Sequence, residues 1–148
     1  MVCLGNICRS PMAEGLMRAV LLEKGIAAEI DSAGTSGHHR GEAPDRRAIR
    51  CMQGHGIDIS MLRARQFVAD DFSRFDHIFV MDLANQRDIM RMPGARQHPS
   101  LRLMLSGTHG HDAEVPDPWY GGQEGFEDVF LMLKEACEHW AAEINKPR

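Results

Sequence analysis

The sequence predicts an α/β fold in which one doubly wound sheet of four parallel strands is flanked by helices. Short apolar segments at residues 1–3, 28–33, 76–81 and 100–105 have the length and composition of buried strands. Segments with helical spacing lie between them, and this alternation is typical of a parallel sheet. The chain contains no repeat, low-complexity tract or linker, so residues 1–148 are expected to form a single domain.

Two of the expected helices begin or end at a recognisable signal. Pro11 stands in the first turn of a helix over residues 10–24, and Gly25 ends it. Asp82 is a suitable N-cap for a helix that runs to residue 91. Further helices are expected at residues 44–54, 68–75 and 126–143, the last with an inward face of Val129, Phe130, Leu133, Cys137 and Trp140.

Composition and charge exclude several classes of protein. A hydrophobic fraction of 43% and a charged fraction of 26% are ordinary for a globular chain of 148 residues. The net charge of −4 offers no basic footprint for nucleic acid. No apolar run reaches the ~18 residues of a membrane helix, and no signal peptide opens the chain. We expect a cytoplasmic protein, monomeric or weakly dimeric, without membrane insertion or cofactor.

The segment Cys3-Leu4-Gly5-Asn6-Ile7-Cys8-Arg9-Ser10-Pro11 joins the first expected strand to the first helix. Parallel sheets bind ligands at the carboxyl ends of their strands, and helix N-termini attract anions. The residues between Cys3 and Arg9 can curl so that several backbone N–H groups point at one centre, and Gly5 permits a tight curl. The segment therefore predicts a cradle for a phosphate dianion.

Cys3 and Arg9 carry the chemistry that this cradle indicates. A thiol beside a helix N-terminus and a cation ionises readily, so Cys3 is expected to attack phosphorus and form a phosphocysteine. The planar guanidinium of Arg9 can grip two phosphate oxygens, and Ser10 can donate to the departing thiolate. Burial as a small hydrophobic residue is the alternative for Cys3, but the surrounding motif favours a nucleophile.

Such an enzyme also needs an acid that protonates the leaving oxygen and then activates water. Asp117 is the candidate, because Pro116 and Pro118 stiffen its loop and two aromatic residues, Trp119 and Tyr120, follow it. Their rings could flank an aromatic substrate. A solvated Asp-Pro turn is the alternative interpretation of this segment.

Together these motifs resemble the low-molecular-weight protein tyrosine phosphatase family over nearly the whole chain. Residues 3–11 are similar to its phosphate loop, 31–35 to its second strand and turn, 76–85 to a central block and 117–120 to its acid loop. The resemblance implies a phosphotyrosine phosphatase I-like fold, with a first strand that looks truncated here. It also implies hydrolysis of phosphotyrosine in proteins, with a tyrosine kinase as one candidate substrate.

The resemblance implies roles for individual residues. Cys3 is the nucleophile, Arg9 the phosphate clamp and Asp117 the general acid, while Cys8 can form a reversible disulfide with Cys3. Asn6, Ser10 and Ser32 match a hydrogen-bond network that shapes the loop. The expected phosphate- and substrate-binding residues are Leu4, Gly5, Asn6, Ile7, Cys8, Ser10, His38, Trp119 and Tyr120. The chain departs from the family at His38, where many members have tryptophan, and at Met61, where a histidine often supports the loop.

Two other functions are compatible with such a loop. Arsenate reduction needs two further cysteines near the third strand, and residues 80–94 contain none. A phosphate-binding or redox-sensing module with weakened catalysis is the second alternative. Ile7 favours phosphotyrosine over phosphoarginine, because arginine-specific relatives carry threonine there.

Cys51 and His55 lie four residues apart on an expected helix and could share one face. No second pair of ligands accompanies them in the sequence. Core packing is therefore favoured over metal binding, and no metal site is expected.

Overall fold

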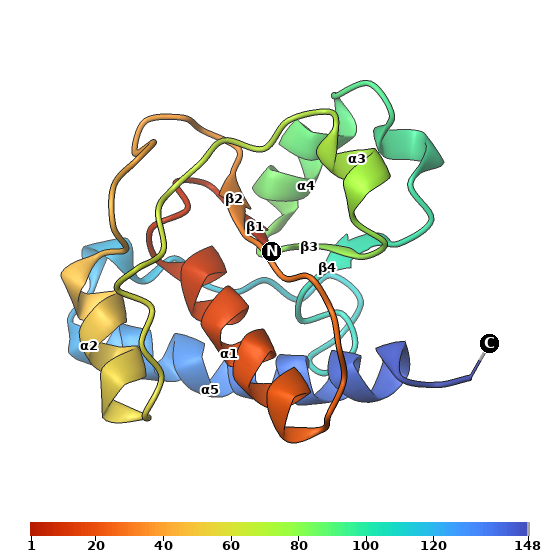
Figure 1. Ribbon diagram of the computed structural model, residues 1–148. Helices are drawn as coiled ribbons and strands as arrows, with labels where there is room; N and C mark the ends of the chain where they lie inside the picture. The colour runs from red at the N-terminus through yellow and green to blue at the C-terminus, as the bar shows by residue number, and fades with distance from the viewer. Residues whose placement is uncertain (148) are drawn as a thin grey trace.

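Four short parallel strands form the centre of the molecule and confirm the expected sheet (Figure 1). The computed structural model describes residues 1–147. The strands lie in the order β2-β1-β3-β4 and comprise β1 (Val2–Cys3), β2 (Ala33–Gly34), β3 (Ile78–Val80) and β4 (Leu101–Leu103). Because β2 and β3 flank β1 on opposite sides, the strand order reverses at β1. The carboxyl end of β1 is therefore the place where such a sheet binds ligands.

Helices cover both faces of the sheet (Figure 1). One face carries α1 (Arg9–Glu23), α2 (Arg46–Gly54) and α5 (Gln123–Ile144). The other face carries α3 (Asp71–Arg74) and α4 (Leu83–Met90). Two 3-10 turns, η1 (Ala95–Gln97) and η2 (Pro118–Tyr120), were not predicted from the sequence. Within residues 1–147, no helix combines the length and hydrophobicity needed to cross a bilayer.

Strand side chains alternate between two hydrophobic layers, as the pleat of a sheet requires. Val2 and Val80 pack beneath α4 with Ile89, whereas Cys3 and Phe79 face the layer of α1 and α5. The inward face predicted for α5 is confirmed, since all its members are buried: Val129, Phe130, Leu133, Cys137 and Trp140. The sheet is therefore buried on both faces.

The second strand is shorter than the sequence predicted. Residues 28–33 were expected, but only Ala33–Gly34 pairs with β1. The Ala33 N–H donates to the Met1 carbonyl and the Met1 amino group donates to the Asp31 carbonyl, both at 3.0 Å. Residues 28–32 instead line a cavity of about 380 Å³, together with residues 75–78. A strand needs a neighbour along its whole length, and β1 pairs with this segment only at Ala33 and Gly34.

Helix starts depend on capping side chains. Asp82 caps α4 as predicted, because its Oδ1 accepts the Asn85 N–H at 2.7 Å in a reciprocal capping box. Asp45 accepts the Arg47 N–H at 2.8 Å, so α2 begins two residues later than expected. The helix expected at residues 68–75 is reduced to α3, because the Asp71 carboxylate accepts the Val68 N–H in a turn.

Gly34→Ala is expected to lower the free energy of unfolding by about 1–3 kcal/mol, the usual cost of overpacking. A Cβ at Gly34 would lie 2.8 Å from the Leu4 carbonyl oxygen and 2.9 Å from that of Ser36. Both are backbone atoms, so relief requires opening the β1–β2 junction. Urea unfolding measures the change. Gly54→Ala at the open end of α2 is the matched control and should be neutral or stabilising; equal losses in both variants would contradict the steric argument.

Candidate active site

The loop after β1 is curled, and hydrogen bonds from other segments of the chain hold it in place. The carbonyls of Cys3, Leu4 and Ile7 accept backbone N–H groups from other segments at 2.8 to 2.9 Å. Asn6 has φ of 57° and is the only non-glycine residue with positive φ in residues 1–147. Asparagine tolerates this left-handed conformation better than most side chains do. The residue with the left-handed conformation in the predicted curl is therefore Asn6, and not Gly5.

Side-chain hydrogen bonds run from Cys3 into the protein. Cys3 Sγ lies 3.0 Å from Ser10 Oγ, which accepts an N–H of Asn6 Nδ2 at 2.7 Å. The same Nδ2 donates to Ser32 Oγ at 2.9 Å, and Ser32 Oγ donates to Glu14 Oε1 at 2.7 Å. Because Ser10 Oγ accepts from Asn6, its own hydrogen can point to the sulfur. The predicted grouping of Asn6, Ser10 and Ser32 is thus present in the structure.

Two charged residues that no sequence motif had indicated, the partly buried Arg65 and the buried Glu14, complete this network. The backbone N–H of Arg65 donates to Asn6 Oδ1 at 3.0 Å, which orients the amide. The Arg65 guanidinium bridges Asp31 and Asp71 at 2.9 to 3.1 Å. Glu14, on α1, is 2% exposed. Its position inside the apolar pattern of that helix was the one local signal in the sequence for this network, because a buried carboxylate needs a partner. Met61, by contrast, is exposed at the surface.

Arg9 is buried beside the end of β3. Its Nη1 donates to Asp82 Oδ2 at 2.7 Å and to the Val115 carbonyl at 2.9 Å. Burial opposes the charge, but the Cys3 sulfur and the Asp82 carboxylate outweigh it and raise the pKa of Arg9. Arg9 is therefore a permanent cation. The local sequence pattern predicts Asp82 only as a helix cap, whereas its second oxygen also binds Arg9.

Asp117 approaches the same cation from the opposite side. Its Oδ2 lies 3.9 Å from Arg9 Nη2, and its Oδ1 accepts the Trp119 N–H at 3.0 Å at the start of η2. The Val115 N–H donates to the Met81 carbonyl at 2.8 Å, which attaches this segment to the end of β3. Arg9 is thus the point at which the Cys3 loop and the Asp117 segment meet.

Arg47 holds the Asp117 segment in place, although no sequence pattern distinguished it from its neighbours. Its Nη1 donates to the carbonyls of Trp119 and Gly121 at 2.9 and 3.0 Å. Its Nε and Nη2 bind the Asp45 carboxylate at 3.0 and 3.1 Å. The guanidinium also lies over the Trp119 ring. One side chain therefore connects α2 to the residues that follow Asp117.

The apolar side chains that follow Cys3 and Asp117 in the chain are exposed, and we call them the rim of the site. Leu4, Trp119 and Tyr120 are all exposed, Tyr120 at 93%. Exposed large apolar groups beside a buried cation suit a ligand that is aromatic at one end and anionic at the other.

His39 lies against this rim. A Cβ at Gly5 would meet His39 Cδ2 at 3.0 Å, and the His39 ring centroid lies 6.0 Å from that of Trp119. His38, the residue chosen from the sequence, is exposed and its N–H donates to Ser36 Oγ at 3.1 Å. Adjacent histidines cannot be told apart by spacing alone, and the turn geometry decides which ring faces Gly5.

Ile7 and Cys8, the last residues of the loop, are both buried. Burial first, and then the charges of Asp45 and Cys3, raise the pKa of the Cys8 thiol far above its ordinary value. Cys8 is therefore protonated, and both it and Cys3 are free cysteines. The disulfide between them remains a prediction.

Asn6→Ala and Asn6→Gly separate hydrogen bonding from backbone strain. Each variant loses the bonds of the amide and is expected to lower the free energy of unfolding by about 1–3 kcal/mol. The free energy of unfolding should be roughly 1 kcal/mol lower for Asn6→Ala than for Asn6→Gly, because glycine adopts the left-handed conformation without a Cβ clash. Urea unfolding should therefore rank wild type above Asn6→Gly and Asn6→Gly above Asn6→Ala. Equal stability of the two variants would show that the backbone is not strained.

Comparison with known proteins confirms the family resemblance. The family described as low molecular weight phosphotyrosine protein phosphatase matches residues 1–148. A low molecular weight protein-tyrosine-phosphatase from Streptomyces coelicolor is 43% identical, over 98% of this chain and 92% of its own length.

Solved structures agree. A protein tyrosine phosphatase from Entamoeba histolytica, crystallised with Hepes in the active site, has a TM-score of 0.89 at 37% identity and covers 97% of this chain and 93% of its own. Vibrio vulnificus Wzb in complex with benzylphosphonate has a TM-score of 0.84 at 27% identity, over 96% of this chain and 94% of its own. The chain belongs to the low molecular weight phosphotyrosine protein phosphatase family.

Proposed function

We propose that this phosphatase hydrolyses phosphotyrosine in protein substrates through a phosphocysteine formed on Cys3. The observation that carries the proposal is the convergence on Arg9, which shares its loop with Cys3 and lies 3.9 Å from the Asp117 carboxylate. A phosphate held at Arg9 is therefore within reach of a nucleophile and an acid. A cysteine-based mechanism is characteristic of the family to which the chain belongs.

The first step transfers the phosphoryl group to sulfur. Arg9 Nη1 is engaged by Asp82 and Val115, so Nε and Nη2 form the fork that binds two phosphate oxygens. The Cys3 thiolate attacks phosphorus in line as the bond from phosphorus to the tyrosine oxygen breaks. Asp117, protonated in this step, transfers its proton to that oxygen, and tyrosine leaves neutral.

The second step releases inorganic phosphate. Water attacks the phosphocysteine, and the Asp117 carboxylate accepts its proton as the phosphorus–sulfur bond breaks. The electron pair returns to Cys3 as a thiolate. Ser10 Oγ, 3.0 Å from the sulfur, donates to that thiolate and lowers the barrier to its departure.

Several features support phosphotyrosine as the substrate class. The exposed rim of Leu4, Trp119 and Tyr120 suits a ring projecting from a bound phosphate. The Vibrio vulnificus relative was solved with benzylphosphonate, an aromatic phosphate analogue. Ile7 in the loop disfavours phosphoarginine. We propose that the substrates are cytoplasmic phosphoproteins, with a tyrosine kinase as one candidate.

Asp117→Asn should slow release of phenol from phenyl phosphate by about 100- to 10,000-fold in the first turnover, the usual contribution of a general acid. The loss should be much smaller for p-nitrophenyl phosphate, because that leaving group departs without a proton. Rapid-mixing kinetics with both substrates provide the measurement. Equal losses on the two substrates would exclude Asp117 as the proton donor. Cys3→Ser should abolish turnover of both, and residual turnover there would exclude Cys3 as the nucleophile.

Peptides carrying phosphotyrosine, phosphoserine or phosphoarginine test the substrate class. Only the phosphotyrosine peptide should be turned over efficiently. Trp119→Ala should raise its KM roughly 2- to 10-fold, as expected for loss of one aromatic contact. Leu131→Ala, an exposed apolar residue on α5, is the control and should leave KM unchanged. Preference for another peptide would contradict phosphotyrosine as the substrate class. Absence of turnover by folded protein would contradict the proposal as a whole and favour a phosphate-binding module.

A further inference from the structure

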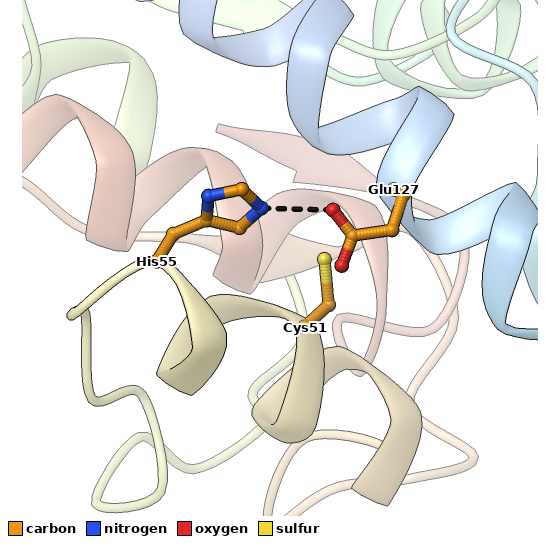
Figure 2. A group of neighbouring side chains, drawn as sticks. All are labelled: Cys51, His55 and Glu127. Atoms are coloured by element: carbon orange, nitrogen blue, oxygen red, sulfur yellow. Dashed lines mark hydrogen bonds and ion pairs between the residues drawn. The ribbon is translucent and has the colours of Figure 1, made fainter.

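A second cluster of reactive side chains lies between α2 and α5 (Figure 2). Cys51 belongs to α2, His55 caps its end, and Glu127 lies on α5. One ligand atom from each, a sulfur, a ring nitrogen and a carboxylate oxygen, all lie within 4.8 Å of one another. The sequence pattern indicated only Cys51 and His55. The fold adds Glu127, which lies 72 positions beyond His55 in the chain.

Packing holds these side chains in orientation. The His55 ring stacks on Phe130 with centroids 3.7 Å apart, and its Nε2 lies 2.8 Å from Glu127 Oε2. Cys51 is buried, with Sγ 3.6 Å from the Phe126 carbonyl oxygen. Figure 2 shows the imidazole and the thiol pointing toward the same carboxylate. The three groups are therefore convergent.

The cluster is open on one side. The side chains of His55 and Glu127 are 36% and 45% exposed, whereas Cys51 is 2% exposed. The hydrogen bond from His55 lowers the pKa of Glu127, so its carboxylate is ionised. Burial, together with that carboxylate, raises the pKa of Cys51 to about 12. An ion can thus enter from solvent and meet an anionic oxygen, a nitrogen and a sulfur.

We propose that Cys51, His55 and Glu127 form a three-ligand site for a thiophilic divalent cation, with Zn²⁺ as the best fit. Zn²⁺ binds sulfur, imidazole nitrogen and carboxylate oxygen tetrahedrally at about 2.0–2.3 Å, which puts the ligand atoms roughly 3.3–3.6 Å apart. Glu127 Oε2 is now 2.8 Å from His55 Nε2, so the half-exposed Glu127 side chain has to rotate away from the ring as the ion enters. As the sulfur–metal bond forms, the thiol proton passes to solvent. Thiolate and carboxylate then neutralise the ion, and water takes the fourth position.

The cation would join the two helices that border the Asp117 segment. Arg47 at the start of α2 binds the Trp119 and Gly121 carbonyls. Gln123 at the start of α5 donates to the Arg47 carbonyl at 3.1 Å. The site lies farther along the same two helices, so a bound ion adds a further connection to the contacts that His55 and Cys51 already make with α5. Its role is structural, with no part in phosphoryl transfer.

Cobalt binding to the full chain tests this proposal, because Co²⁺ reports thiolate ligation by an ultraviolet charge-transfer band and four-coordination by strong visible bands. One equivalent should bind to the wild type with both signals. Cys3→Ser should keep them, since it removes only the phosphate-loop thiol. Cys51→Ala should lose them. His55→Gln and Glu127→Gln should weaken binding by more than about tenfold, because even outer-shell partners of a metal contribute that much.

A matched control is His111→Gln, since His111 forms an exposed pair with Asp112 at 2.9 Å outside the cluster. It should bind cobalt as the wild type does. Zn²⁺ should also raise the Tm of the wild type and of Cys3→Ser, but not of Glu127→Gln. Glu127 is half-exposed, so this variant keeps the test valid where Cys51→Ala is poorly folded.

Two outcomes would overturn the proposal. Absence of a thiolate band in the wild type would leave the cluster as core packing with an ion pair only. Signals that persist in Cys51→Ala and vanish in Cys3→Ser would place the ion at the phosphate loop instead. None of these measurements uses catalytic turnover, so their failure leaves the proposed function unaffected.

Discussion

The buried guanidinium of Arg9 is the constraint on which the rest of the site depends. Its side chain is 3% exposed, and a charge in such a place is costly unless it is paired. The hydrogen-bond partners come from separate segments, Asp82 after β3 and the Val115 carbonyl, and the Cys3 sulfur at the end of β1 also favours the charged form of Arg9. Removing one partner of a buried pair typically costs about 3–5 kcal/mol. The adjacency of β1 and β3 is what brings these segments to one cation.

The loop that presents Cys3 is kept in an unfavourable backbone conformation by its hydrogen bonds. Asn6 stays left-handed because its amide is bound at every position, to Ser10, Ser32 and the Arg65 backbone. Two of those partners are themselves bound by carboxylates: Glu14 accepts from Ser32, and Asp31 and Asp71 bind the Arg65 guanidinium. A loop fixed in this way does not have to reorganise when a phosphate arrives, and such preorganisation is a main source of electrostatic catalysis.

The Asp117 segment is more exposed and is held differently. It has a backbone bond to the end of β3 at Val115, and Arg47 binds the carbonyls of Trp119 and Gly121. Its position therefore depends on α2 staying packed against α5. The proposed cation site lies on these two helices, so the same packing would support both the acid and the ion.

The sequence by itself determined the features that have local signatures. Helical spacing, the Asp82 cap, the strand-to-helix turn at Cys3–Arg9 and the stiff Asp-Pro segment all arise between near neighbours in the chain. They predicted the parallel sheet, the order of its elements along the chain and the loop that carries Cys3 and Arg9. Each of these follows from backbone sterics and hydrogen bonding within a few residues.

Only the tertiary structure decided what depends on distant partners. It shortened β2, because a strand extends only where a neighbour pairs with it. It placed His39 against Gly5, recruited Arg65 and Arg47 to the two loops, and brought Glu127 to Cys51 and His55. These side chains lie tens of residues from the groups they contact. No local pattern encodes such contacts, because they exist only once the helices have packed on the sheet.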